Sequence, residues 1–338
     1  MTLKNKKIAC RVLAVLFTAL ALSAFTGCSK NAGSKKTGKS IAVYIPGIMA
    51  DSPIYAKLAA GAEAAVESFN ATAKEGEKAE IKIVEGGTNQ AEWPGHLTTL
   101  CAEGKYDVII SSNPSLPELC EPLTKQFPNQ KFILLDAMKE GNNSIVTARY
   151  AQDESAFMTG YVAGLMTKTN KIGLITAQEY PVMNEIILPG YEKGAKAAND
   201  KVEVDFRIVG NWYDAKKGAE LADAMSASGV DVILPICGGA CQGVIASAKE
   251  HGTKLCFFDS NSYSAAPGQV ISCVETLQEK LTERLTLEFL NGKTVWGSFN
   301  EYGMKDGLVK FNDTDPLYIE SVPEEIRNKI AKQLEKWN

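Results

Sequence analysis

The sequence predicts an α/β fold built as two doubly wound parallel-sheet lobes with a hinge between them. From Ser40 onward, short β-branched apolar runs alternate with amphipathic helical stretches. This alternation is typical of parallel sheets that helices cover on both faces. The alternating series starts again at residue 171, and two such series in one chain predict two lobes.

The predicted elements follow in order along the chain. The first series has strands at 41–45, 81–84, 107–111, 131–135 and 145–148, with helices near 53–69, 90–103 and 115–127. The second has strands at 171–175, 203–209, 231–236 and 254–258, with helices near 153–168, 183–199, 215–228 and 240–250. A long helix at about 274–291 is expected to return to the first lobe, ahead of a strand at 307–311 and a closing helix at 323–337. The predicted lobes are therefore 40–148 with about 262–292, and 149–261 with about 293–338.

The first residues have the features of a processing signal. A basic front is followed by an apolar run from Val12 to Leu22, which falls short of the roughly 20 residues that a membrane span needs. The sequence Phe25-Thr26-Gly27-Cys28 resembles a lipobox, the site where bacterial lipoproteins are lipidated and cut. We expect 1–27 to be a signal peptide, Cys28 to carry acyl chains and 28–39 to form a polar tether. An uncleaved membrane anchor is the alternative.

Composition excludes several classes of function. The net charge of −4 argues against a broad nucleic-acid-binding surface. Two histidines, His96 and His251, are too few for a histidine-rich metal site, and neither lies where a serine nucleophile would pair with it. Six cysteines follow Cys28, and the sequence leaves open whether any of them pair. Cys237 and Cys241 lack neighbouring histidines, so a zinc site there is not expected.

Candidate site residues come from the carboxyl ends of the predicted strands, where open α/β sheets bind ligands. They are Asp51, Tyr55, Trp93, Asn113, Asp136, Tyr180, Trp212, Gly238 and Asp259. Trp212 lies in a polar turn and would stack on a planar ligand, while the Asp259 carboxylate would accept hydrogen bonds from hydroxyl groups. The alternatives are a helix cap for Asp51, a domain-interface aromatic for Trp212 and a turn residue for Asp259.

Four passages resemble the basic membrane protein family of lipoprotein receptors, which includes purine-nucleoside receptors. They are 150–168, 211–220, 229–243 and 257–272. The resemblance implies a type I periplasmic-binding fold and a cleft that takes a nucleoside-like ligand. Because no nucleophile–base set and no exposed apolar helix emerge from the sequence, we expect a monomer that is not an enzyme and needs no catalytic cofactor. The resemblance also implies a permease and an ATPase of an ABC importer as partners. By the same resemblance, Trp212 falls where the family has a base-stacking Phe, and Asp259 falls on its ribose-binding Asp. Asp51, Asp136 and Gly238 also match family positions near the cleft.

Three departures from the family concern the ligand. Ile54-Tyr55 stands where the family has Phe-Asn, Trp212 is larger than the family's Phe, and Glu275 replaces a lysine beside the ligand. We therefore expect riboflavin ahead of a purine nucleoside, and an unphosphorylated ligand in either case. A surface adhesin with a vestigial cleft is the alternative from another class.

Overall fold

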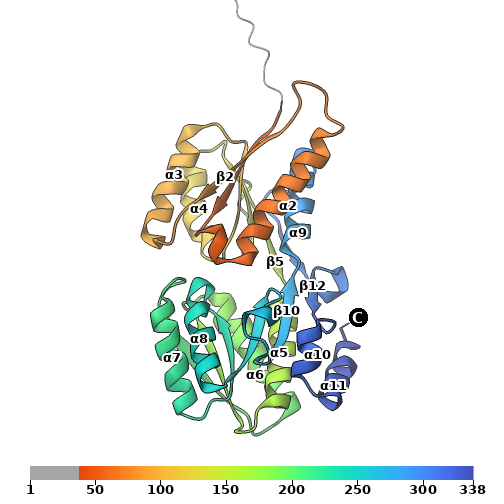
Figure 1. The fold of residues 1–338 in the computed structure, drawn as a ribbon. Coiled ribbons are helices and arrows are strands. Elements are labelled where there is room, and N and C mark those ends of the chain that lie inside the picture. The colour runs from red at the N-terminus through yellow and green to blue at the C-terminus, as the bar shows by residue number, and fades with distance from the viewer. Residues whose placement is uncertain (1–37, 338) are drawn as a thin grey trace, which may run out of the picture.

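A computed structural model describes residues 38–337 as two α/β lobes, one above the other in Figure 1. The predicted signal peptide, Cys28 and nearly all of the predicted tether lie outside the described residues. The two lobes confirm the fold class that the sequence predicts.

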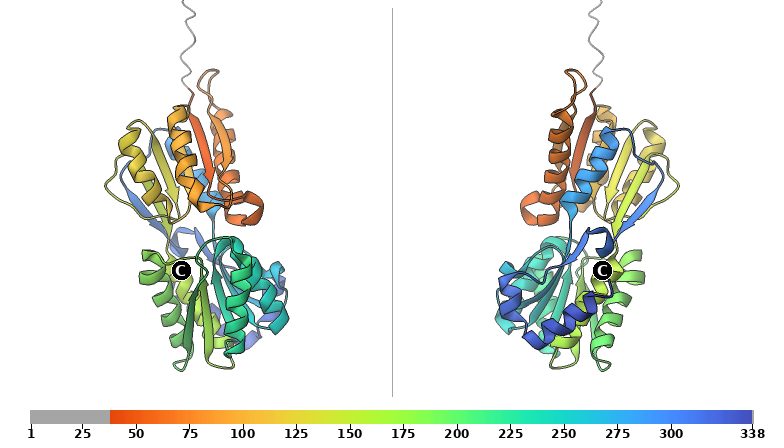
Figure 2. Two further views of the ribbon diagram at one scale, coloured as in Figure 1. Left: turned by 90° about the vertical axis from the view of Figure 1, so that its left-hand side faces the viewer. Right: turned by 90° about the vertical axis from the view of Figure 1, so that its right-hand side faces the viewer.

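Lobe 1 contains a six-stranded, fully parallel sheet. The strand order is β11 (Phe299–Tyr302), β5 (Ile145–Tyr150), β4 (Lys131–Leu135), β3 (Val108–Ser112), β1 (Ser40–Ile45) and β2 (Glu80–Glu85). The central strands are buried along their whole length, as expected for a sheet between two helical layers. One layer pairs α2 (Pro53–Asn70) with α9 (Gln278–Leu290), and the other pairs α3 (Trp93–Glu103) with α4 (Leu116–Gln126) (Figure 2).

Lobe 2 repeats this layout with one difference. Its strand order is β12 (Val309–Phe311), β10 (Val270–Thr276), β9 (Lys254–Asp259), β8 (Val232–Ile236), β6 (Lys171–Thr176) and β7 (Glu203–Ile208). The edge strand β12 is antiparallel, whereas its counterpart β11 in lobe 1 is parallel. The helices pack as two pairs, α5 (Gln152–Met166) with α6 (Leu188–Ala198), and α7 (Ala215–Ala227) with α8 (Cys241–His251). Two further helices, α10 (Pro316–Ser321) and α11 (Glu324–Leu334), complete the lobe.

The chain passes between the lobes at Ala151, Leu277 and Gly303, each between an element of one lobe and an element of the other. Ala151 N donates to Tyr302 O at 2.7 Å, and Leu277 N donates to Leu308 O at 2.9 Å. The Tyr150 hydroxyl donates to Gln278 Oε1 at 2.7 Å. These bonds join the crossings into one hinge on one side of the molecule.

Two late segments differ from the sequence prediction. The helix predicted from 274 begins at Gln278, because Val270–Thr276 forms β10 and pairs with β9 in the second sheet. Its β-branched residues are buried on both faces, which favours a strand over an amphipathic helix. Conversely, Phe299–Tyr302 was assigned to lobe 2, but it forms β11 beside β5 in lobe 1. Residues 152–276 therefore lie in lobe 2, and the chain returns to lobe 1 only for 278–302.

Candidate functional site

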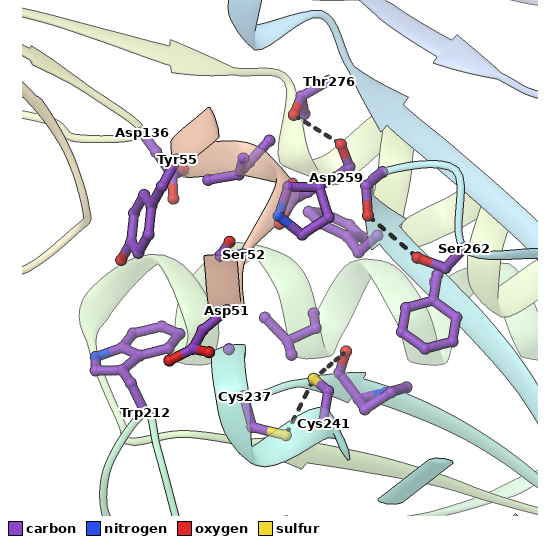
Figure 3. A pocket seen from close by; sticks show the side chains of 18 of the residues that line it. Asp51, Ser52, Tyr55, Asp136, Trp212, Cys237, Cys241, Asp259, Ser262 and Thr276 are labelled. Carbon is purple, nitrogen blue, oxygen red and sulfur yellow. Dashed lines mark hydrogen bonds between the residues drawn. The ribbon is translucent and has the colours of Figure 1, made fainter. Parts of the chain in front are cut away.

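A cavity of about 280 Å³ lies between the lobes, where the carboxyl ends of both sheets face each other. Its lining comes from the strand ends and following turns of both lobes, as the open α/β rule predicts. Seven of the residues proposed from the sequence line it: Asp51, Tyr55, Asn113, Asp136, Trp212, Gly238 and Asp259. Figure 3 shows Tyr55 and Trp212 on one side of this cavity and Asp259 with Ser262 on the other.

Two aspartates occupy equivalent positions in the two lobes. Asp136 follows β4 and Asp259 ends β9, and these strands hold the same place in the two sheet orders. Both residues have left-handed backbones, with φ of 51° and 75°. A non-glycine residue adopts this conformation at a free-energy cost, which is often found where a side chain is held for a function. Each strand end therefore turns a carboxyl group toward the cavity (Figure 3).

The environment of the two carboxyl groups favours their protonated forms. Burial, and then repulsion from Asp259, raises the pKa of Asp136 well above its usual range. Burial also raises the pKa of Asp259 to about 7, partly offset by the nearby Lys57 ammonium. Gln152 Nε2 donates to Asp136 Oδ1 at 2.6 Å. The pair therefore offers both hydroxyl donors and acceptors to a polar ligand near neutral pH.

Trp212 forms an aromatic wall on the lobe 2 side. It follows β7 in a turn, and 8% of its surface is exposed. Its ring lies 6.3 Å from that of Tyr180, and its carbonyl oxygen accepts a hydrogen bond from Ala240 N at 3.1 Å. The indole Nε1 is buried without a protein partner, as is Nε2 of Gln278 in the same cavity lining. Because buried donors are normally paired, these two are candidates for ligand contacts.

Lobe 1 provides a polar wall. Asp51 lies in a short 3₁₀ turn before α2, whose N-cap is Ser52, and neither side chain is hydrogen-bonded as a cap. Tyr55, one turn into α2, is buried, and this burial raises its pKa to about 12. Asn113 follows β3, and its Oδ1 accepts from Ser115 N at 2.9 Å. The helix-cap alternative for Asp51 is thus not what the structure shows.

Three residues proposed from the sequence lie off the cavity. Trp93 is buried in the lobe 1 core, where its Nε1 donates to Gly87 O at 3.0 Å. Glu275 lies in β10, accepts from Asn312 Nδ2 at 2.6 Å and lies 4.0 Å from Lys57 Nζ. Tyr180 lines a side cavity of about 100 Å³ that shares Asp136 and Pro114 with the main one. Tyr180 and Glu275 therefore adjoin the site, the latter as the neighbour of Asp259 across the sheet, whereas Trp93 does not.

Other cavity residues were not identified from the sequence. They are Tyr150, Cys237, Cys241, Gln242, Phe257, Phe258, Ser262, Thr276 and Gln278 among others. Thr276 and Gln278 were missed because the predicted helix covered the end of β10. Cys237, Cys241 and Gln242 belong to the glycine-rich run after β8, whose position at a strand end was the available signal.

Contacts across the cleft mouth hold the lobes in this arrangement. The Tyr213 hydroxyl of lobe 2 donates to Pro46 O of lobe 1 at 2.7 Å. A Cβ at Gly47 would lie 1.9 Å from that hydroxyl oxygen, so the close approach requires glycine. Gln178 Nε2 likewise donates to Ser115 Oγ at 2.9 Å. The cavity is therefore bounded by direct bonds between lobes.

The chemistry of the cavity is that of a binding site. Within residues 38–337, no group of three or more His, Cys, Asp or Glu side chains is arranged to hold a metal ion. The cavity lining described here contains no histidine, lysine or arginine. Aromatic and aliphatic surface with a few convergent polar groups is typical of small-molecule sites.

Comparison with known proteins agrees with this description. Residues 38–336 match a family described as ABC transporter substrate-binding protein, PnrA-like. The chain belongs to this family. The "CD4+ T-cell-stimulating antigen" of Listeria innocua is 28% identical over 295 residues, covering 78% of this chain and 82% of that protein. The "ABC transporter nucleoside-binding protein BmpA" of Lactococcus lactis is 27% identical over 244 residues, covering 67% and 68% respectively. An ABC transporter solute-binding protein from Aeropyrum pernix K1 shares the fold, with 19% identity, coverage of 88% and 86% and a TM-score of 0.71.

Membership of the family confirms the general function predicted from the sequence. The protein is the substrate-binding component of an ABC transporter; it binds a small molecule and is not an enzyme. Its partners in transport are a permease and an ATPase, and its role places it outside the cytoplasm at a membrane. Among the described residues 38–337, no helix has the length and apolarity needed to cross a bilayer.

Proposed function

We propose that this protein captures an unphosphorylated nucleoside between its lobes and delivers it to the permease of an ABC importer. The observation that carries the proposal is the cavity itself, which has the Trp212 indole on one wall and two strand-end carboxyl groups, Asp136 and Asp259, beside it. A nucleobase stacks on an aromatic ring, and ribose hydroxyls bond to carboxyl groups. The name of the Lactococcus relative supports the same ligand class.

The size of the cavity favours a nucleoside over riboflavin, which the sequence favoured. At about 280 Å³ it lies at the small end of ligand pockets, which span about 300–1,000 Å³. A flavin would bring a three-ring system and a longer polyol chain into this space. Trp212 and Tyr55 suit either aromatic ring, so volume is the feature that separates the two ligands.

Calorimetric titration tests the proposal directly. We expect adenosine, guanosine or inosine to bind saturably at one site, and free ribose and riboflavin to bind far more weakly. Tight binding of riboflavin, with a yellow preparation from the producing cells, would replace the nucleoside with the flavin. Absence of saturable binding by any small aromatic ligand would favour the adhesin alternative.

We also propose that Cys28 anchors the protein to the membrane through acyl chains, with 28–39 as tether. The support is the sequence alone, because these residues precede the described part of the chain. Cys28→Ala is expected to move the protein from the detergent phase to the aqueous phase in a phase-partition assay, since acyl chains give a protein its membrane affinity. A chain lacking 1–39 is expected to be soluble, folded and monomeric by light scattering. Insolubility of that chain would contradict the proposal.

A further inference from the structure

Two cysteines stand side by side in the cavity wall of lobe 2. Cys237 follows β8, and Cys241 begins α8 after the short 3₁₀ turn Gly238–Ala240. Their Sγ atoms lie 3.3 Å apart, and both thiols are free. Both residues line the cavity, as Figure 3 shows, and the proposed function uses neither of them.

The geometry suits a disulfide between them. A disulfide bond is about 2.05 Å long, so the sulfurs need to approach by little more than about 1 Å. Only the three-residue turn separates the two cysteines, so closure requires no movement between the lobes. The other cysteine pair of lobe 2 differs, because Cys256 is aligned with Ser272 on the neighbouring strand. Cys273 is one residue further and therefore points to the opposite face of the sheet.

The two thiols also differ in access. Cys237 is fully buried, whereas Cys241 is half-buried at the cavity surface. An oxidant that enters the empty cleft therefore meets Cys241 first. Because the thiolate of the accessible sulfur is the one an oxidant encounters, Cys241 makes the first attack.

We propose that Cys237 and Cys241 form a reversible redox site that small-molecule disulfides oxidise and thiols reduce. The Cys241 thiolate attacks one sulfur of the small disulfide, forms a mixed disulfide and releases one thiol. The Cys237 thiolate, after losing its proton to solvent, then attacks the Cys241 sulfur and releases the second thiol. One small disulfide is reduced to two thiols while two protein thiols become one protein disulfide.

Oxidation reaches the ligand site through the turn between the cysteines. Ala240 N donates to Trp212 O and to Cys237 O, each at 3.1 Å. Gly238, with φ of 58°, lies directly against the Trp212 indole, since a Cβ there would be 3.3 Å from a ring carbon. Formation of the disulfide therefore shifts Gly238 and Ala240, the residues that contact Trp212, and with them the proposed stacking ring. This coupling rests on the proposed function, and by thermodynamic reciprocity bound nucleoside opposes oxidation.

Peptide mapping tests the redox site without reference to any ligand. The full-length chain in detergent is reduced, incubated with oxidised glutathione, unfolded in the presence of an alkylating agent so that buried thiols react, and digested with trypsin. Cys237 and Cys241 are the only cysteines of the tryptic peptide 218–249, and Cys256 with Cys273 share peptide 255–280 as an internal control. We expect 218–249 to lose two hydrogens and resist alkylation, while 255–280 is alkylated at both cysteines. Full alkylation of 218–249, or a lasting glutathione adduct without closure, would overturn the proposal.

Calorimetry of the reduced and oxidised proteins tests the coupling to ligand. We expect oxidation to weaken adenosine binding by about tenfold, dithiothreitol to restore it, and saturating adenosine to slow oxidation. Cys241→Ser, which removes the attacking sulfur, should abolish the redox dependence of affinity, whereas Cys101→Ser, in the lobe 1 core, should retain it. Equal affinity in both redox states would overturn the coupling. If the reduced protein binds no nucleoside, the proposed function fails while the mapping result stands.

Discussion

The two lobes place an aspartate at the same point of the same sheet, yet they surround it differently. Asp136 is bonded by Gln152 of α5, and Asp259 is stabilised as an anion by Lys57 of α2. In each case the partner comes from the opposite lobe. The protonation of each carboxyl group therefore depends on closure of the cleft. The two groups have equivalent backbone positions, and they differ in protonation because their neighbours differ.

The two walls of the cavity also differ in the side chains that each lobe contributes. Lobe 1 contributes Asp51, Tyr55 and Asn113 beside Asp136, while lobe 2 contributes Trp212, Phe257 and Phe258 beside Asp259. One wall favours hydrogen bonding and the other favours burial of a ring. A ligand with a planar face and several hydroxyls can satisfy both walls only when the lobes are together.

A negative charge on the ligand should reduce its affinity for this cavity more than any other change considered. We expect a nucleoside monophosphate to bind at least about a hundredfold more weakly than its nucleoside, because its phosphate would be desolvated beside carboxyl groups and no lysine or arginine lines the cavity. The sequence predicts this from Glu275 together with Asp51, Asp136 and Asp259; in the structure Glu275 lies off the cavity, and the three aspartates line it. Titration with both forms measures the ratio, and equal affinities would contradict an effect of the missing cation in the cavity lining.

Removing the aromatic wall is expected to have the next largest effect. Trp212→Ala should weaken nucleoside binding by about tenfold to a hundredfold, since stacking on an aromatic contributes roughly 1–3 kcal/mol per base. The matched control is Trp296→Ala, a half-buried tryptophan of lobe 1 that lies outside the cavity. Unchanged affinity in the Trp212→Ala variant would contradict the proposal that the ligand ring stacks on Trp212.

Replacing each of the two aspartates should change the pH dependence of the unfolding free energy by a different amount. Asp259 has a folded pKa of about 7 against an ordinary 3.8, so its neutral form stabilises the fold and that contribution is lost as pH rises through 7. Asp259→Asn, which stays neutral, should equal the parent below pH 4 and gain about 4 kcal/mol above pH 7.

Urea unfolding across pH measures both curves. For Asp136→Asn the gain should be larger, because burial, and then repulsion from Asp259, raises the pKa of Asp136 well above its usual range. Asp200→Asn, at an exposed position of the same protein, serves as control and should show no such gain. Parallel pH curves for the two site variants would contradict the difference between lobes.

The bond across the cleft mouth gives the smallest expected effect. Tyr213→Phe removes the hydroxyl that bonds to Pro46 O, a contribution of about 1 kcal/mol, so affinity should fall by roughly fivefold. Tyr161→Phe, a half-buried tyrosine of α5 that does not line the cavity, is the control. Small-angle scattering of the ligand-free variants would show a more open average shape only for Tyr213→Phe. An unchanged affinity would mean that this bond is not part of the bound state.

The sequence predicted the strands and their ends better than the direction of the side chains there. The β-branched runs locate β4 and β9, and hence Asp136 and Asp259, because buried parallel strands have a distinctive composition. Trp93 also lies in a strand–helix turn, yet its indole enters the core, because Gly87 O accepts from its nitrogen and the ring fills space behind α3. Hydrophobic periodicity does not specify whether a side chain in such a turn enters the core or the cavity. Glu275 was misplaced for a related reason, since the polar residues of β10 obscured its strand pattern.

The order of the elements along the chain has a consequence for biosynthesis. Lobe 1 begins at residue 40, but its helix α9 and edge strand β11 are encoded after nearly all of lobe 2. A growing chain therefore carries an unfinished first sheet, with one edge of β5 unpaired, until residue 302 has emerged. Lobe 2 completes its own sheet only nine residues later, at the end of β12. Both sheets are therefore completed within a few residues of each other, late in vectorial synthesis, and neither lobe can close its sheet while most of the chain is still to be made.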